Sequence, residues 1–105
     1  MAERIAFRMK LKPGNVAEYR KRHDEIWPQL VATLREAGVS DYTIWHDPET
    51  DHLFATLVLA EDNSLAQVPA TEINRRWWDF MADIMVYDDR NEPVQLPLGK
   101  MFSMA

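Results

Sequence analysis

The segment from His52 to Leu59 constrains the fold of this chain most strongly, because it alternates like a β-strand and is apolar on both faces. One face consists of Leu53, Ala55, Leu57 and Leu59, and the other of Phe54, Thr56 and Val58. A sheet that contains such a strand needs cover on both sides. A chain of 105 residues can cover one side with its own helices. We therefore expect the other side to be the interface of a homodimer formed through the sheet face.

Hydrophobic periodicity along the remaining chain predicts the order strand, helix, strand, strand, helix, strand. The predicted strands lie at 4–11, 41–47, 52–59 and 98–104, and the predicted helices at about 15–37 and 70–85. Turn-forming residues between the second and third strands make these two a hairpin. We also expect a short helix within 61–69 and a long loop at 86–97, which is a candidate lid. The order is typical of a ferredoxin-like α+β sandwich (βαββαβ), with residues 1–105 as a single domain.

The first predicted helix carries local signals at its ends and one proline in its interior. Asn15 is expected to be the N-cap, with Glu18 completing a capping box, and Gly38 the left-handed terminator. Pro28 is expected to kink the helix. The kink either opens space above the residues that precede it or only curves the helix around the sheet, and the sequence leaves both possibilities open.

The charge balance and the composition argue against several classes of function. The formal net charge is -5, from 12 basic and 17 acidic residues, which argues against nucleic acid as a partner. A solvated helix face explains the basic run Arg20-Lys21-Arg22. The sequence has no cysteine, no apolar run at its N-terminus and no apolar stretch of membrane-spanning length. We therefore expect a soluble cytoplasmic protein that does not enter the membrane.

The histidines and glycines of the chain do not support a bound metal or nucleotide. His46 and His52 flank an acidic turn that contains Asp47, Glu49 and Asp51, but their spacing matches no established set of metal ligands. The chain has three glycines and no glycine-rich phosphate loop.

One face of the first helix carries two residues that can transfer protons, Tyr19 and His23. They are four residues apart, where helical side chains become neighbours, and Trp27 follows one turn later. Histidine exchanges a proton near neutral pH, and a phenol can orient it or hold a substrate hydroxyl. The alternative for His23 is a core histidine whose hydrogen bonds are satisfied, and position alone does not decide between the two.

Tryptophan provides the second set of candidate ligand contacts, with four residues in the chain. The indole ring offers a flat apolar surface to the C–H face of a sugar, and its N–H can donate a hydrogen bond. Trp77 and Trp78 are consecutive and therefore point about 100° apart on a helix. We expect one of them in the core and the other near the edge of the apolar stripe. The alternative is an aromatic stripe that belongs entirely to the core.

Two motifs together resemble the L-rhamnose mutarotase family. They are Tyr-x-x-x-His at 19–23 followed by Ile26-Trp27-Pro28, and Arg76-Trp77-Trp78. The segments 41–44 and 53–55 and the chain length are also similar to that family. The resemblance implies a cytoplasmic homodimer with a ferredoxin-like fold of the dimeric α/β-barrel type. It also implies that the protein interconverts the α and β anomers of L-rhamnose without a cofactor.

The resemblance assigns roles to five residues. His23 corresponds to the proton donor, and Tyr19 on the same helix corresponds to a substrate-binding tyrosine. Tyr42 corresponds to a second substrate-binding tyrosine, and Trp77 and Trp78 correspond to the paired tryptophans of the family. We expect His23 to transfer the proton and the other four residues to bind the sugar. Apolar neighbours such as Met9 are expected to receive the deoxy methyl group.

The hairpin turn, residues 63–69 and residues 96–105 depart from the family pattern, so the lid and the range of accepted sugars are not fixed by the resemblance. Two alternatives are compatible with the fold. One is a cofactor-independent monooxygenase on the same dimeric scaffold, with a histidine and tryptophans around a flat aromatic substrate. The other is a sugar- or peptide-binding dimer module without catalytic activity.

Overall fold

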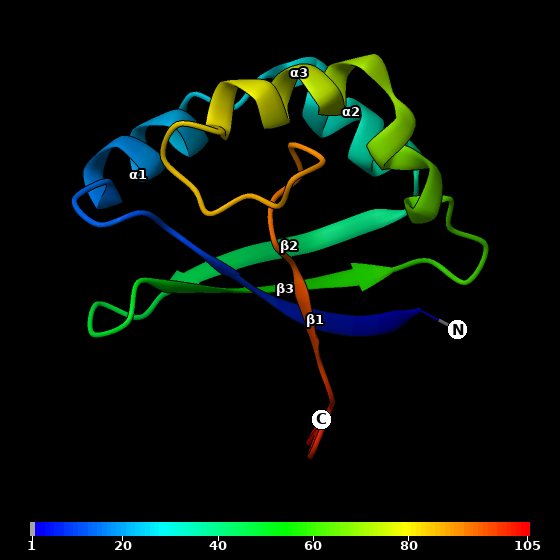
Figure 1. The fold of residues 1–105 in the computed structure, drawn as a ribbon. Coiled ribbons are helices and arrows are strands. Elements are labelled where there is room, and N and C mark those ends of the chain that lie inside the picture. Colours follow the sequence, from blue (N-terminus) through cyan, green and yellow to red (C-terminus); the bar gives the residue numbers. More distant parts are fainter. Residues whose placement is uncertain (1) are drawn as a thin grey trace.

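The computed structural model describes residues 2–105 and consists of a layer of helices on one face of a β-sheet (Figure 1). The strands are β1 (Glu3–Lys10), β2 (Val39–His46), β3 (His52–Leu59) and β4 (Leu96–Leu98), and the helices are α1 (Val16–Asp24), α2 (Pro28–Glu36), the 3-10 helix η1 (Leu65–Ala70) and α3 (Glu72–Met81). The sheet is antiparallel, with the strand order β2-β3-β1-β4. This is the arrangement of a ferredoxin-like α+β sandwich, so the predicted fold class is confirmed.

Strand β3 lies inside the sheet, between β2 and β1. Its buried face packs toward the helices and consists of Leu53, Ala55, Leu57 and Leu59. The opposite face is only half-buried, because no helix of the described chain lies on that side of the sheet (Figure 1). The two apolar faces of this strand therefore have different environments, and the protein itself covers one of them.

The single helix predicted at 15–37 is wrong, because the chain forms two helices, α1 and α2, at this place. Trp27 adopts an extended conformation, with φ -67° and ψ 126°, and Pro28 begins α2. A proline disfavours helical geometry in the residue before it, whereas the first turn of a helix tolerates a proline because it needs no N–H there. Pro28 therefore starts a helix and does not kink one.

The signals at the ends of this region had different outcomes. Asn15 precedes α1, but its side chain makes no capping bond to the helix, so the predicted capping box is wrong. Its Nδ2 instead donates hydrogen bonds to the carbonyl oxygens of Lys12 and Pro13, at 3.1 Å each, which closes the turn after β1. Gly38 has φ +93°, as predicted for a left-handed terminator, and a Cβ there would lie 3.0 Å from the Cβ of Asn63.

The second half of the chain keeps the predicted order with shifted boundaries. Helix α3 is shorter than the predicted 70–85, and Thr71 caps its start by accepting a hydrogen bond from the backbone N–H of Asn74. The last strand is β4 at Leu96–Leu98, whereas the predicted strand at 98–104 is wrong. Gly99 follows β4 directly, and glycine weakens a strand. Of the described helices, none is both long and apolar enough to cross a membrane.

The basic run on α1 is not entirely solvated as predicted, because Arg22 is a packing residue. Its guanidinium forms ion pairs with Glu18 at 2.7 Å and with Asp83 at 2.9 Å. It also donates a hydrogen bond of 2.7 Å to the carbonyl oxygen of Phe80. It also lies over the Phe80 ring, 4.4 Å from the ring centroid. These contacts attach α1, which carries Tyr19 and His23, to the end of α3, which carries Trp77 and Trp78.

Candidate active site

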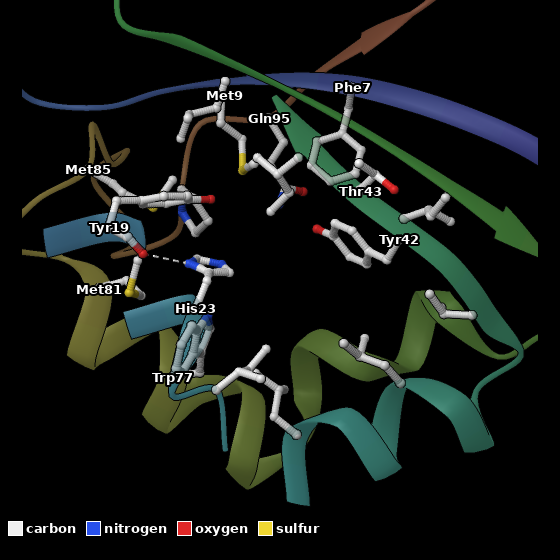
Figure 2. Close-up of a pocket in the computed structure, with 18 of the residues that line it drawn as sticks. Phe7, Met9, Tyr19, His23, Tyr42, Thr43, Trp77, Met81, Met85 and Gln95 are labelled. Carbon is white, nitrogen blue, oxygen red and sulfur yellow. Dashed lines mark hydrogen bonds between the residues drawn. The ribbon is translucent and has the colours of Figure 1, made fainter. Parts of the chain in front are cut away.

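A cavity of about 1210 Å³ lies between the inner face of the sheet and the helices. Figure 2 shows that side chains from α1, α3 and the sheet point into it from opposite sides. The five residues singled out from the sequence all line this cavity: Tyr19, His23, Tyr42, Trp77 and Trp78. The fold therefore brings together residues that are up to 59 positions apart, from Tyr19 to Trp78.

The imidazole of His23 is fixed in one tautomer by the backbone of its own helix. Its Nδ1 lies 3.0 Å from the carbonyl oxygen of Tyr19, one turn earlier on α1 (Figure 2). A carbonyl oxygen only accepts hydrogen bonds, so Nδ1 carries the proton and Nε2 of the neutral ring keeps its lone pair. Nε2 makes no hydrogen bond to any described residue. His23 is therefore not a fully satisfied core histidine.

The surroundings of His23 favour its neutral form. Burial lowers the pKa of His23 below its usual value, although the hydrogen bond to the Tyr19 carbonyl and the charge of Asp24 act in the opposite direction. At neutral pH the ring is thus an unprotonated base that faces the cavity. This protonation state suits the removal of a proton from a weakly acidic group.

Two aromatic rings hold His23 in place. The Tyr19 ring lies 4.3 Å from the imidazole, centroid to centroid, at an interplanar angle of 30°. The Trp77 ring meets the imidazole edge to face, at 5.4 Å and 89°. Burial raises the pKa of Tyr19 well above its usual value, so its phenol stays protonated and can donate a hydrogen bond. The contact that the four-residue spacing of Tyr19 and His23 predicted is present.

Tyr42 reaches the cavity because of an irregularity in β2. Ser40 pairs with Val58 and Thr43 with Thr56, so β2 has one residue more than β3 between these two pairs. This extra residue is a β-bulge. Asp41, which lies within it, has φ +48°, a left-handed conformation that is uncommon outside glycine.

The bulge changes which residues of β2 face the helices. Val39 is buried in the core, and Tyr42, three positions later, points into the cavity (Figure 2). In a regular strand, residues three positions apart lie on opposite faces. The bulge thus lets both side chains face inward. The Tyr42 ring meets Phe7 of β1 edge to face at 6.4 Å. Although 40% of the Tyr42 surface is exposed, desolvation of its phenol raises the pKa of Tyr42 to about 12.

The paired tryptophans divide as the sequence predicted. Trp77 is buried, with 7% of its surface exposed, and it packs against His23 and Trp27. Trp78 is half-buried and lines the cavity at the edge of the apolar stripe. The backbone carbonyl of Trp78 accepts a hydrogen bond of 2.6 Å from the hydroxyl of Tyr87.

Sequence reasoning did not single out four further residues that line the cavity, three in one loop and one on α3. Tyr87, Pro93 and Gln95 belong to the predicted loop at 86–97 and lie beside the cavity. This loop is attached to the body of the protein, because Val86 donates a backbone hydrogen bond of 3.0 Å to Lys10. The fourth residue is Asn74 of α3. It lies four residues before Trp78, and this helical spacing is the sequence signal that could have indicated it.

The remaining histidines lie at the β2–β3 hairpin. His46 Nε2 lies 3.0 Å from Asp51 Oδ1, and the His52 ring contacts Phe54 edge to face at 6.3 Å. Within residues 2–105, no group of three or more histidine, aspartate or glutamate side chains is arranged to hold a metal ion.

The fold is also found in a protein that is described as a monooxygenase. A putative antibiotic biosynthesis monooxygenase from Nitrosomonas europaea aligns with a TM-score of 0.62 over 99% of this chain and 94% of its own chain, at 12% sequence identity. At that level of identity, the similarity establishes the shared fold and nothing about activity.

Comparisons at higher identity agree on one family. A family model described as L-rhamnose mutarotase matches residues 4–104. The L-rhamnose mutarotase of Mesorhizobium japonicum is 54% identical over 105 residues, which is 100% of each chain. That of Burkholderia ambifaria is 52% identical over 95% of this chain and 96% of its own. The crystal structure of the L-rhamnose mutarotase from Formosa agariphila aligns with a TM-score of 0.89 and 46% identity, over 98% of this chain and 99% of that one. The chain therefore belongs to the L-rhamnose mutarotase family.

Proposed function

We propose that this protein interconverts the α and β anomers of L-rhamnose through the open-chain aldehyde. The observation that carries the proposal is the tautomer of His23. Its Nδ1 is hydrogen-bonded to the Tyr19 carbonyl oxygen, which leaves Nε2 available as a base at the cavity. Relatives that share half of the sequence or more along nearly the whole chain are named for this activity, which supports the choice of substrate.

The reaction moves one proton and breaks one bond in the ring. His23 Nε2 takes the proton from the anomeric hydroxyl, and the imidazolium gives a proton to the ring oxygen as the bond between this oxygen and the anomeric carbon breaks. The aldehyde turns about the neighbouring C–C bond, and the ring closes on the other face by the reverse steps. The transfers balance without a redox step, so the reaction needs no cofactor. Positioned proton transfer of this kind contributes about 10²–10⁴-fold to the rate.

The other four residues would bind and orient the sugar. The phenols of Tyr19 and Tyr42 stay protonated because burial raises their pKa values, so each can donate a hydrogen bond to a sugar oxygen. Trp77 and Trp78 supply apolar surface for the C–H groups of the ring. Met9, which is 6% exposed and lines the cavity, belongs to the apolar wall that would receive the methyl group.

A homodimer formed through the outer face of the sheet is part of the same proposal. Trp45 of β2 is 64% exposed, and the outer face of β3 adds Phe54 and Val58, which are half-buried. Exposed apolar side chains on an uncovered sheet face of a small protein favour association. A cytoplasmic location, which the family resemblance implies, completes the proposal.

Exchange NMR of L-rhamnose near neutral pH tests the proposed activity. The two anomeric proton signals should exchange faster with the protein than in buffer alone. A rate equal to the buffer background, both for L-rhamnose and for related deoxy sugars, would refute the mutarotase activity. Oxygen consumption with a quinol would then be measured for the monooxygenase alternative, and sugar binding without faster exchange would indicate a binding module.

A further inference from the structure

Asn74 is a buried polar residue in an otherwise largely apolar part of the core. Its side chain is 6% exposed, and its Nδ2 has no hydrogen-bond partner among residues 2–105. Asn74 also lines the cavity that contains His23. Buried side-chain amides are nearly always hydrogen-bonded, because leaving a donor without a partner destabilises the folded protein. The position of this amide beside the cavity therefore suggests that a ligand is its partner.

Helix geometry fixes where this amide lies relative to the other site residues. Asn74, Trp77, Trp78 and Met81 all line the cavity, at the spacing of one helix face. The backbone N–H of Asn74 donates to the Thr71 hydroxyl, so the residue lies in the capped first turn of α3. It precedes Trp77, which contacts His23, by three residues or about 4.5 Å along the helix axis.

The chemistry of a carboxamide suits a hydroxyl group. The last torsion of asparagine is soft and roughly two-fold, so the side chain can present either its N–H₂ or its oxygen to the cavity. A sugar hydroxyl both donates and accepts hydrogen bonds. It can therefore pair with Asn74 in either orientation, whereas a methyl group or a ring C–H cannot.

We propose that Asn74 binds a ring hydroxyl of the sugar other than the anomeric hydroxyl and that this bond contributes to the choice of substrate. This inference rests on the proposed function. Asn74 lies one turn of α3 away from the tryptophan that contacts the proton-transferring histidine, so it meets the sugar away from the reacting carbon. A site built to pair with a hydroxyl discriminates against analogues that lack it, because the buried amide is then left without its partner.

The test compares L-rhamnose with its analogues that lack the hydroxyl at C-2, C-3 or C-4, in the wild type and in Asn74→Leu. Dissociation constants come from NMR titration, and exchange rates are measured at saturating sugar. One analogue should bind the wild type about three- to tenfold more weakly than L-rhamnose does, the range expected for one neutral hydrogen bond. Asn74→Leu should bind L-rhamnose and this analogue equally.

Stability separates this role from a structural one. Replacing an unpartnered buried amide with an apolar side chain of similar size should leave Tm unchanged or raise it. If Asn74→Leu does not fold, Asn74→Ala replaces it in the same comparison. Val68→Ala is the matched control, because Val68 is equally buried at 6% and lines the cavity without a polar group. It should change the affinity for L-rhamnose and for its analogues by a common factor.

Two results would overturn the inference in different ways. The first compares, for each analogue, the ratio of its dissociation constant to that of L-rhamnose. If these ratios are the same in Asn74→Leu as in a catalytically active wild type, the role of Asn74 is refuted and the proposed function is not. A wild-type protein that neither binds L-rhamnose nor speeds anomer exchange would refute the proposed function together with this inference.

Discussion

The bulge at Asp41 gives a prediction that links backbone strain to the position of Tyr42. Asp41 has φ +48° and forms an ion pair with Arg4 across the sheet. We consider two substitutions, Asp41→Gly and Asp41→Val. Both remove the carboxylate and hence the ion pair, but glycine tolerates a left-handed conformation and valine, which is β-branched, does not. The difference between the two variants therefore isolates the backbone conformation.

The magnitude follows from the geometry of the site. The side chains of Arg4 and Asp41 are 46% and 62% exposed, so their ion pair contributes at most about 1 kcal/mol, and both variants lose it. A left-handed conformation costs a residue with a Cβ about 1–2 kcal/mol. Glycine avoids this cost but makes the unfolded chain more flexible, which offsets about 0.4–1 kcal/mol. We expect Asp41→Val to be about 1 kcal/mol less stable than Asp41→Gly.

Urea unfolding of the two variants measures this difference, and sugar titration measures its consequence at the site. If valine forces β2 toward a regular strand, Tyr42 turns away from the cavity. Asp41→Val should then bind L-rhamnose more weakly than Asp41→Gly does, and this difference should disappear in a Tyr42→Phe background, where the hydroxyl is already missing. Equal stability and equal affinity of the two variants would show that the bulge does not position Tyr42.

Three further predictions concern pH, helix packing and assembly. Because burial lowers the pKa of His23, kcat/KM should be flat above pH 7 and fall as the pH drops through this lowered value, and a fall of activity above pH 7 would contradict this. The free energy of unfolding should also decrease below about pH 6.5, because the unfolded chain binds the proton first. Arg22→Ala should lower the free energy of unfolding in urea by about 1–3 kcal/mol. Arg22→Lys should restore only part of this loss, because lysine cannot reproduce the paired hydrogen bonds to Asp83 at 2.9 and 3.2 Å. Full recovery by lysine would contradict the paired geometry. Light scattering at micromolar concentration should give a dimer mass for the wild type and a monomer mass for Trp45→Glu, and a monomeric wild type would refute the dimer.

The fold could be predicted from the sequence where one local pattern had one structural solution. The two apolar faces of β3 required cover on both sides of the sheet, and the helices of the described chain cover one of them (Figure 1). Gly38 required a left-handed conformation and has one. Pro28 was expected to kink one helix, but it begins a second one, because the first turn of a helix also tolerates a proline. The ring of the extended Trp27 packs against Trp77 and Phe80, and these contacts between distant segments are not visible in the local sequence.

The candidate site was predictable to the extent that it depends on helix periodicity. The spacing of Tyr19 and His23 predicted the contact between their rings, which lie 4.3 Å apart. The burial of Arg22 was missed because its partner Asp83 is 61 residues away in the sequence. Asn74 was missed although it precedes Trp78 by one helical turn, because the spacing alone does not show that a cavity lies beside it.

The central claim is that His23 transfers the proton, and exchange NMR of L-rhamnose with two alanine variants tests it most directly. His23→Ala removes the imidazole at the cavity, and His52→Ala removes a half-buried imidazole at the start of β3 that does not line the cavity. Both variants must show the circular dichroism and Tm of a folded protein. We predict exchange at the buffer rate for His23→Ala and close to the wild-type rate for His52→Ala. Exchange at the wild-type rate in folded His23→Ala would contradict the account.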